Sequence, residues 1–434
     1  MASAVLIKSI GCRTNQEEMT ALAAQLAGDG YYVVYDLADA DVAIVNSCLV
    51  TSAAEAKTRR YISSVSHAYP GVRICVTGCL AQHSPHEILK RMPVTWVVGN
   101  SRKHDIPAIL RKKEGGVFHG AMDAHALAAV SLVNSPTCPG ASGRTRFFLK
   151  IQEGCNYRCA YCIVPLVRGP SRSVSFDRVV GVFEDALRAG YKEIVLTGTH
   201  IGQYSDGPSC GLEALVERLA NTDGDFRVRL SSLDPRDMSD SLLQMIGSHP
   251  RLCRHLHLSV QSLSPAVLKN MGRPIAEHGR FLEKLASFRK SFPLAGLGGD
   301  FITGFPGETN EQFDGTCRAA VECGFTFGHV FRYSCRPGTL ASAMPGQIDE
   351  KEKSRRSERL RKLLEDRRRL FVRSAAGEVQ RVLVEEESPA AGLASNYLRI
   401  EVAGHTAPAN TWIDVTVSGI GNKKDRCGAV LAKS

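Results

Sequence analysis

The sequence predicts an α/β protein that ends in a small, mainly β unit. Two successive series of short apolar runs alternate with helical patterns, which is typical of parallel sheets covered by helices. A strongly basic segment follows these series, and strand-like segments separated by glycines follow the basic segment. The 434 residues exceed the size of one domain, so we expect four units, at 1–130, 140–350, 351–373 and 374–434.

The first unit is expected to be a Rossmann-like α/β domain, because its short apolar runs are typical of buried parallel strands. The strands are predicted at 5–7, 42–46 and 72–78, and the helices between them at 16–28 and 53–67. The segment 121–144 is rich in Ala, Ser, Pro and Gly and is expected to be a linker.

The second unit contains six predicted strands separated by helical stretches. They lie at 147–151, 193–196, 226–230, 255–260, 296–302 and 328–331. Such a series predicts a full or partial β/α barrel, whose functional site is expected at the C-terminal ends of the strands.

The basic segment 351–373 is predicted to be a helix. It holds 11 Lys or Arg and 4 Asp or Glu, a net charge of +7 within a chain of net charge +10. Five apolar side chains are expected on or near one face: Leu360, Leu363, Leu364, Leu370 and Phe371. The segment is either a solvated helix between domains or an element that faces phosphate groups.

The last unit, 374–434, is predicted to be a small β-barrel. Its strands are expected at 379–384, 397–402 and 412–417, with glycines between them.

Composition narrows the class of protein. Hydrophobic residues make up 44% of the chain, no apolar run is long enough to span a bilayer, and the N-terminus lacks signal-peptide features. We therefore expect a cytoplasmic protein with no membrane partner. Fourteen cysteines in so long a chain indicate metal or redox chemistry rather than disulfides, and the positive charge indicates an anionic partner.

Cys155, Cys159 and Cys162 form a C-x3-C-x2-C motif just after the first strand of the second unit. Three soft thiolates this close together can hold an iron–sulfur cluster and leave one iron without a protein ligand, which suits chemistry at the metal. The alternative, a structural zinc site, needs a fourth Cys or His nearby.

With Tyr161 before its last cysteine, this motif resembles the signature of radical S-adenosylmethionine (SAM) enzymes. The resemblance implies a 4Fe-4S cluster that binds SAM and cleaves it to a 5′-deoxyadenosyl radical, so Cys155, Cys159 and Cys162 are the predicted catalytic residues. The other residues implied to contact SAM follow the motif and later strands: Tyr161, Gly198, Thr199, Ser231, Ser232, Asp300 and Gly304.

Over essentially its full length the chain also resembles the methylthiotransferases within that superfamily. Cys12, Cys48 and Cys79 carry this resemblance, and each follows a predicted parallel strand, so the three can meet at one sheet edge. The family implies that they hold a second 4Fe-4S cluster, which supplies the sulfur. The alternative is three unrelated buried cysteines.

The C-terminal unit resembles the RNA-binding TRAM domain, with a matching motif at 396–400. The resemblance implies tRNA, through its anticodon stem-loop, as the partner, and no DNA. The candidate phosphate contacts are Arg399, Lys423, Lys424 and Arg426. Tyr397 is expected either to stack on a base or to fill the barrel.

Within this family the sequence favours the MtaB type, which modifies N6-threonylcarbamoyladenosine. Gln152 and the segments 168–173 and 229–235 resemble that type, whereas Leu263 and Gly272 depart from the family pattern. Asp234 also stands where Glu is usual. These departures concern the substrate side, so the alternatives are N6-isopentenyladenosine of tRNA and an aspartate of a ribosomal protein.

The resemblance implies transfer of a methylthio group to carbon 2 of the adenine at tRNA position 37. One SAM methylates sulfur, a second SAM provides the radical, and an electron donor such as flavodoxin reduces the cluster. Two other interpretations remain: a non-catalytic iron–sulfur RNA-binding sensor, and a radical enzyme whose N-terminal cluster only relays electrons.

Overall fold

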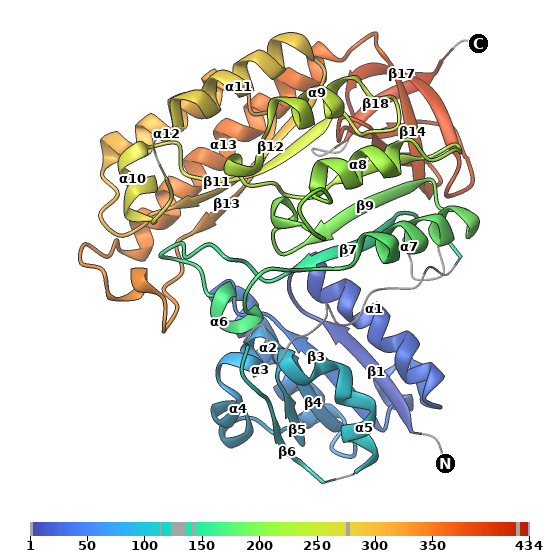
Figure 1. Ribbon diagram of the computed structural model, residues 1–434, viewed down its shortest axis with the longest axis vertical. Coiled ribbons are helices and arrows are strands. Elements are labelled where there is room, and N and C mark those ends of the chain that lie inside the picture. The colour runs from blue at the N-terminus through green and yellow to red at the C-terminus, as the bar shows by residue number, and fades with distance from the viewer. Residues whose placement is uncertain are drawn as a thin grey trace.

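The computed structural model describes residues 3–112, 114–122, 136, 138–139, 144–274, 278–421 and 426–432. An N-terminal α/β domain lies below a central β/α domain in Figure 1, and a C-terminal β-barrel lies beside the central domain. The fold class predicted from the sequence is therefore confirmed.

The N-terminal domain contains a six-stranded, fully parallel sheet in the order β2-β1-β3-β4-β5-β6. Its strands are β1 (Ala4–Ser9), β2 (Tyr32–Val34), β3 (Val42–Ser47), β4 (Arg73–Gly78), β5 (Trp96–Val98) and β6 (Gly116–Phe118). Its helices are α1 (Arg13–Gly28), α2 (Ser52–Ala68), α3 (Cys79–His83), α4 (Pro85–Arg91) and α5 (Ile106–Arg111). This order is the flavodoxin-like form of the doubly wound fold, in which the chain direction switches between β1 and β3 and a ligand crevice opens at that point.

The central domain is a partial β/α barrel of six parallel strands. They are β7 (Phe147–Glu153), β9 (Glu193–Gly198), β10 (Arg227–Leu230), β11 (His255–Gln261), β12 (Gly296–Thr303) and β13 (Phe327–Arg332). Two parallel bridges, Val228 to Leu252 and Leu233 to Leu258, join the β7-β9-β10 sheet to the β11-β12-β13 sheet. The short strand β8 (Arg172–Ser173) runs antiparallel on the outer edge of β7, so the barrel stays open there.

Helices cover the outside of this partial barrel (Figure 1). They are α7 (Phe176–Arg188), α8 (Leu212–Ala220), α9 (Asp240–Ser248), α10 (Pro265–Asn270), α11 (His278–Ser291) and α12 (Asn310–Glu322). The short helix α6 (Val164–Arg168) lies instead between the two α/β domains, against α3 of the N-terminal domain (Figure 1). The apolar side chains between strands and helices form the largest core of the molecule. This core gives the strand ends, where the candidate site lies, a rigid base.

The basic segment forms one helix, α13 (Glu350–Ser374), which connects the central domain to the barrel. Leu360 and Leu364 are buried in the central core, and Phe371 is buried in the core of the barrel. Leu370 is 50% exposed, so its predicted place on the apolar face is wrong: it precedes Phe371 by one residue, about 100° around the helix.

Many cations of α13 are neutralised within the protein. Arg356 bonds to Glu308 and Glu352, and Arg359 pairs with Asp314. These pairs leave fewer cations free for phosphate groups than the net charge suggests, whereas Lys351 and Lys362 are exposed on the same helix.

The C-terminal domain is a closed barrel in the order β14-β15-β16-β18-β17. The strands are β14 (Val379–Glu387), β15 (Ala390–Ala394), β16 (Arg399–Val402), β17 (Trp412–Ile420) and β18 (Cys427–Leu431). The sequence analysis missed β15, whose Ala- and Gly-rich sequence has low β propensity, and β18.

The barrel packs on the N-terminal ends of the central strands. Arg227 and Arg229 of β10 donate to barrel carbonyls, and Tyr397, at φ +69°, stacks on His255 at 4.4 Å between ring centres. Both expectations for Tyr397 are therefore wrong: its ring neither fills its own barrel nor lies free for a base, because it closes the base of the central barrel. None of the helices in the described part of the chain could cross a membrane.

Candidate functional site

The C-terminal strand ends of the two α/β domains face one cavity of about 390 Å³. Cys12, Cys48 and Cys79, which follow β1, β3 and β4, line it from the N-terminal domain. Tyr161 and Cys162, in the loop after β7, line it from the central domain. Three thiols of the first triad and one of the second, Cys162, therefore face a single space, whereas Cys155 and Cys159 are not among its lining residues.

Local backbone geometry brings the N-terminal thiols together. Cys12 is the N-cap of α1, and Cys79 is the first residue of α3, directly after Gly78. Gly78 has φ +97°, and a Cβ there would lie 2.3 Å from the backbone oxygen of Ser47. Only glycine fits this turn, which places Cys79 beside the end of β3.

The N-terminal thiols influence one another electrostatically. Burial raises the pKa of Cys48 to about 12, and the neighbouring Cys79 and Cys12 add to the effect. Burial also raises the pKa of Cys12, although the positive charge of Arg168 opposes the shift. Cys12 is exposed because its side chain faces the cavity between the two domains. Without an added positive charge the thiols of Cys12 and Cys48 stay protonated, so the donor set suits a metal group that replaces the protons.

The second triad lies in the loop after β7. The amide of Cys162 donates to the carbonyl of Cys159 at 2.9 Å, which turns the loop back on itself. Gly154, at φ +78°, precedes Cys155, and a Cβ there would lie 1.9 Å from the carbonyl oxygen of Pro170. Burial raises the pKa of Cys162 to about 12, with smaller contributions from Cys159 and Cys155.

Cationic side chains surround this second triad. Arg236 and Arg273 each place a guanidinium nitrogen 3.9 Å from the sulfur of Cys159. Both arginines pair with Asp234, whose pKa lies at about 2: burial raises it, but the bond from Arg236 and the charge of Arg273 outweigh burial. The arrangement holds positive charge next to sulfurs that must lose their protons to bind metal.

His200 and Asp237 form a dyad at the same triad, and the sequence analysis missed it. His200 Nδ1 lies 3.4 Å from the sulfur of Cys155, and His200 Nε2 lies 2.5 Å from Asp237 Oδ2. Burial lowers the pKa of His200, but the bonds to Asp237 and Cys155 outweigh burial and raise it to about 9. His200 directly follows Gly198 and Thr199, which the sequence predicts to contact SAM. Its position just after β9 could therefore have identified it as a candidate site residue.

The spacing of the thiols fits a cluster better than a single ion. A tetrahedral ion with metal–sulfur distances of about 2.3 Å needs its sulfurs within roughly 4 Å of one another. Among the described residues, the set of three His, Cys, Asp or Glu ligand atoms within 4.8 Å of one another is His257, Asp300 and His329, which belongs to neither triad. Neither triad is such a set, so a group with several irons, such as a 4Fe-4S cluster, suits the thiols better than one ion.

Most of the predicted SAM contacts lie at the cavity. Tyr161, Gly198, Thr199, Ser232 and Asp300 line it. Of these, Thr199 has a buried hydroxyl with no hydrogen-bond partner among the described residues, which leaves it available to a ligand.

Two of the predicted SAM contacts lie away from the cavity lining. The Ser231 amide bonds to the carbonyl of Leu196, and Gly304 packs against Lys353 of α13, where a Cβ would lie 2.4 Å from a side-chain carbon. Their positions indicate a role in the shape of the strand ends.

The two positions that depart from the family pattern also lie outside the cavity lining. Leu263 is 4% exposed in the central core, and Gly272, at φ +69°, lies beside the backbone of the second triad's loop. Gln261, two residues before Leu263, lines the cavity and has φ +65°. A non-glycine residue in this region is uncommon and often marks a functional site.

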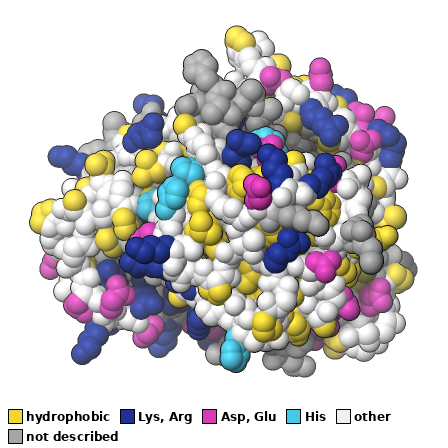
Figure 2. Space-filling view, turned by 90° about the horizontal axis from the view of Figure 1, so that it is seen from below, with side chains coloured by type: hydrophobic (Ala, Val, Ile, Leu, Met, Phe, Trp, Pro, Cys, Tyr) yellow, Lys and Arg dark blue, Asp and Glu magenta, His cyan; other side chains and the backbone are white. Residues whose placement is uncertain are grey.

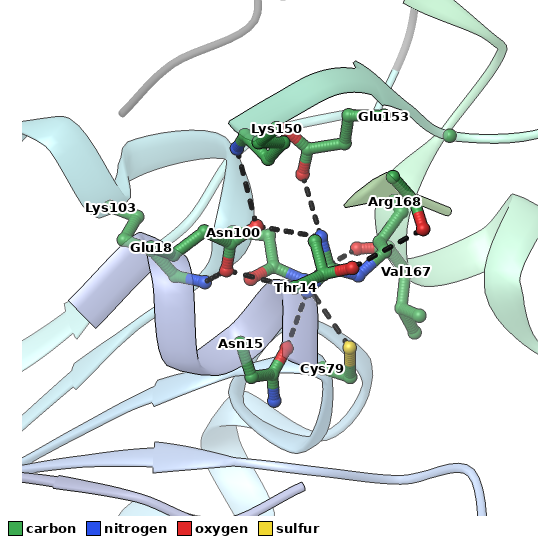
Figure 3. Close-up of polar contacts among 12 residues, drawn as sticks. Thr14, Asn15, Glu18, Cys79, Asn100, Lys103, Lys150, Glu153, Val167 and Arg168 are labelled. Atoms are coloured by element: carbon green, nitrogen blue, oxygen red, sulfur yellow. Dashed lines mark hydrogen bonds and ion pairs between the residues drawn. The ribbon is translucent and has the colours of Figure 1, made fainter. Parts of the chain in front are cut away.

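A buried ion network joins the two domains beside the N-terminal triad (Figure 3). Arg168 donates to Glu18 of α1 at 2.7 Å and to Glu153 of β7 at 2.9 Å. Lys103 and Lys150 complete the network, and each of the five side chains is at most 6% exposed. Three cations face two carboxylates, so one positive charge is in excess beside the thiols of Cys12 and Cys79, which interact with Arg168.

The candidate phosphate contacts of the barrel are only partly described. Arg399 pairs with Glu385 and Glu386, and Arg426 pairs with Glu386 and Glu401. Lys423 and Lys424 lie outside the described residues.

On the face in Figure 2, which looks onto the N-terminal domain, Lys and Arg lie in separate groups among Asp and Glu.

Comparison with known families matches both α/β domains. Residues 4–99 match the family described as Uncharacterized protein family UPF0004. Residues 149–320 match the Radical SAM superfamily.

Curated relatives match most of the chain. A protein of Thermotoga maritima named threonylcarbamoyladenosine tRNA methylthiotransferase MtaB is 36% identical over 88% of this chain and 86% of its own length. A protein of Jannaschia sp. named tRNA-2-methylthio-N(6)-dimethylallyladenosine synthase is 34% identical over 89% of this chain and 84% of its own length.

Among solved structures, the radical SAM methyltransferase TsrM of Kitasatospora setae, with cobalamin and a 4Fe-4S cluster bound, shares the fold. Its TM-score is 0.61 at 13% identity, and the match covers 79% of this chain and 77% of that one.

Proposed function

The chain belongs to the radical SAM methylthiotransferase family, and from this premise we propose that it adds a methylthio group to carbon 2 of N6-threonylcarbamoyladenosine at position 37 of tRNA. Its general activity is that of a tRNA methylthiotransferase that uses radical SAM chemistry. The observation that carries the proposal is the single cavity between the two cysteine triads. A radical source and a sulfur source can act there on one base.

The two triads have different roles in this proposal. Cys155, Cys159 and Cys162 would hold the 4Fe-4S cluster that binds SAM, and Cys12, Cys48 and Cys79 would hold the second cluster. When bound, these groups supply the 5′-deoxyadenosyl radical and the methylthio sulfur. Because thiols from both triads line the cavity, the target base can be held between them only if it is turned out of its RNA stack.

The surrounding side chains position these groups. Tyr161, Thr199 and Ser232 line the cavity where SAM would bind, and the unpartnered hydroxyl of Thr199 can donate to it. His200, held by Asp237, fixes Cys155, while Arg236 and Arg273 offset the negative charge of metal-bound Cys159. Arg168 does the same for Cys12 and Cys79.

The choice of nucleoside rests on the polarity of the central barrel. Relatives with either substrate name are about equally similar to the chain. Gln152 does not distinguish the two nucleosides, because its side chain bonds to backbone groups near Cys155. These groups are the carbonyls of Glu153 and Gly154 and the amide of His200. Inside the barrel, however, Ser259, Gln261 and Asp300 place hydrogen-bonding groups in a cavity that is otherwise lined mainly by apolar side chains. An isopentenyl group would leave these polar groups unpaired, whereas the polar atoms of a threonylcarbamoyl group can pair with them.

RNA binding is proposed for the C-terminal barrel and α13. Arg399 and Arg426 would have to exchange carboxylate partners for phosphate groups, whereas Lys351 and Lys362 of α13 are exposed. An electron donor such as flavodoxin would reduce the clusters.

The test is nucleoside mass spectrometry of tRNA from a strain that lacks the gene. We expect 2-methylthio-N6-threonylcarbamoyladenosine to disappear, to return with the wild-type gene, and to stay absent with Cys12→Ala or Cys159→Ala. Exposed Cys335, replaced by alanine, is the matched control and should restore the nucleoside. Loss of 2-methylthio-isopentenyladenosine instead would contradict the assigned substrate and keep the chemistry.

A further inference from the structure

We propose that His257, Asp300 and His329 form the subsite that receives the threonylcarbamoyl side chain of the target adenosine, an inference that rests on the proposed function. These three side chains come from adjacent strands, β11, β12 and β13. Neither the cysteine motifs nor the ion network uses His257 or His329.

The three residues form one hydrogen-bonded group. His257 Nε2 and His329 Nδ1 both lie 3.0 Å from the same carboxylate oxygen, Oδ1 of Asp300. The other oxygen of Asp300 lies 3.5 Å from the hydroxyl of Ser232. Asp300 and His329 are paired in the parallel register of β12 and β13, so rigid strands fix the group.

The group lies one layer below the cavity wall. Asp300, Ser259 and Phe331 line the cavity. His257 and His329 precede Ser259 and Phe331 by two residues and therefore point to the same face of the sheet. The two imidazoles thus lie deeper in the barrel than the residues that line the cavity, below Asp300.

Each imidazole keeps one nitrogen uncommitted. Asp300 engages His257 Nε2 and His329 Nδ1, and no hydrogen-bond partner is found among the described residues for His257 Nδ1 or His329 Nε2. Gly298 packs closely against His257, since a Cβ there would lie 2.6 Å from Nδ1 and 2.3 Å from the ring of Phe327. Burial raises the pKa of Asp300, but its bonds to both histidines outweigh burial and hold the pKa well below its usual range, so a carboxylate orients both rings.

The chemistry of the base directs its substituent towards these imidazoles. In adenine, N1 separates C2 from C6, so a base that turns C2 to the thiol-lined walls directs the group on N6 away from them. The threonylcarbamoyl group ends in a hydroxyl and a carboxylate. The hydroxyl can donate to one uncommitted nitrogen, and the carboxylate can accept from the other when that imidazole carries a second proton. An isopentenyl group would leave both nitrogens unpaired.

A metal ion is the competing occupant of this group. Histidines that bind metal donate their second ring nitrogen to a carboxylate, carbonyl or water that fixes the ring. Here Asp300 engages one nitrogen of each ring and leaves the other without a partner among the described residues, so the free nitrogens can bind either a metal ion or a polar organic ligand. The position below the cavity that receives the base favours the organic ligand, and the Zn²⁺ measurement below tests the ion. With either occupant Asp300 has a positioning role in place of the SAM contact expected from the sequence.

The test compares anticodon stem-loops that carry threonylcarbamoyl- or isopentenyladenosine as ligands of the reconstituted holoenzyme. Fluorescence anisotropy gives the two Kd values for wild type, His329→Ala, His257→Ala and Asp300→Asn. His329 has a 60% exposed side chain, so its replacement should not disturb folding. The matched control is His104→Asn, a surface histidine of the N-terminal domain whose side chain is 51% exposed.

We expect wild type to prefer the threonylcarbamoyl stem-loop, and each subsite variant to lose roughly 10- to 100-fold in affinity for that ligand alone. His104→Asn should keep the preference. If wild type prefers the isopentenyl stem-loop, the proposed substrate fails and the subsite fails with it. If wild type prefers threonylcarbamoyl but the variants keep that preference, the subsite alone is overturned. Stoichiometric Zn²⁺ binding that His329→Ala abolishes would also overturn it.

Discussion

Replacing Arg168 by methionine should strongly destabilise the contact between the two α/β domains. The guanidinium group bonds to Glu18 at 2.7 Å and to Glu153 at 2.9 Å, so it links α1 of one domain to β7 of the other. Methionine has a similar volume and no charge, so the variant removes the ion pairs and leaves little empty space. Lysine at this position would keep the charge and lose the forked geometry.

The magnitude follows from what remains around the carboxylates. Removal of one partner from a buried ion pair costs about 3–5 kcal/mol, because the other charge stays buried. Glu18 would keep Lys103 at 2.5 Å, and both Glu18 and Glu153 would keep Lys150 within 3.5 Å. These remaining pairs place the loss at the lower end, about 3 kcal/mol for Arg168→Met, and about half of that for Arg168→Lys.

The assay is urea unfolding of the cluster-free protein followed by tryptophan fluorescence. Trp96 is fully buried in β5, so its emission reports the N-terminal domain when Trp412 is replaced by phenylalanine. A double-mutant cycle with Glu18→Gln should give a coupling energy of about 1–3 kcal/mol. A loss below about 1 kcal/mol for Arg168→Met, or no coupling to Glu18, would refute the reasoning.

Three further outcomes are expected. Cys12→Ala should lower the iron content of reconstituted protein from about eight to about four atoms per chain, while Cys335→Ala keeps eight; unchanged iron in Cys12→Ala would contradict the assignment of the N-terminal triad. Gly78→Ala should destabilise the N-terminal domain by more than about 2 kcal/mol, measured by the same unfolding, because the left-handed backbone and two contacts at 2.3 Å exclude a Cβ. Asp237→Asn should destabilise the cluster-free protein by about 2–3 kcal/mol below pH 6.5. Because the pKa of His200 is raised from 6.5 to about 9, this difference should fade as pH rises through 9, and a thermal-melting difference that grows with pH would contradict it.

Local patterns in the sequence were enough to place the cysteines. Cys12, Cys48 and Cys79 follow short apolar strands, and the C-terminal ends of parallel strands meet at one edge, so their convergence could be expected. A further local signal was available, because Gly11-Cys12, Gly78-Cys79 and Gly154-Cys155 share a dipeptide whose glycine has positive φ.

Contacts between distant segments could not be predicted in this way. Asp237 approaches His200 only because the turns after β9 and β10 adjoin, and His257 meets His329 only through β12 between them. Nothing local marks these pairs, since their geometry depends on strand order and register. Tyr397 was misplaced for the same reason: its motif describes the C-terminal barrel, while its partner His255 belongs to another domain.

The stack of Tyr397 on His255 has a consequence for how the protein can be divided. His255 and His257 lie on the same face of β11, and their ring centres are 6.3 Å apart, so the histidines inside the central barrel rest on a residue of the C-terminal barrel. A chain shortened before β14 would therefore lose Tyr397 and expose His255, at the base of the central barrel, to water. The C-terminal barrel thus completes the interior of the central domain.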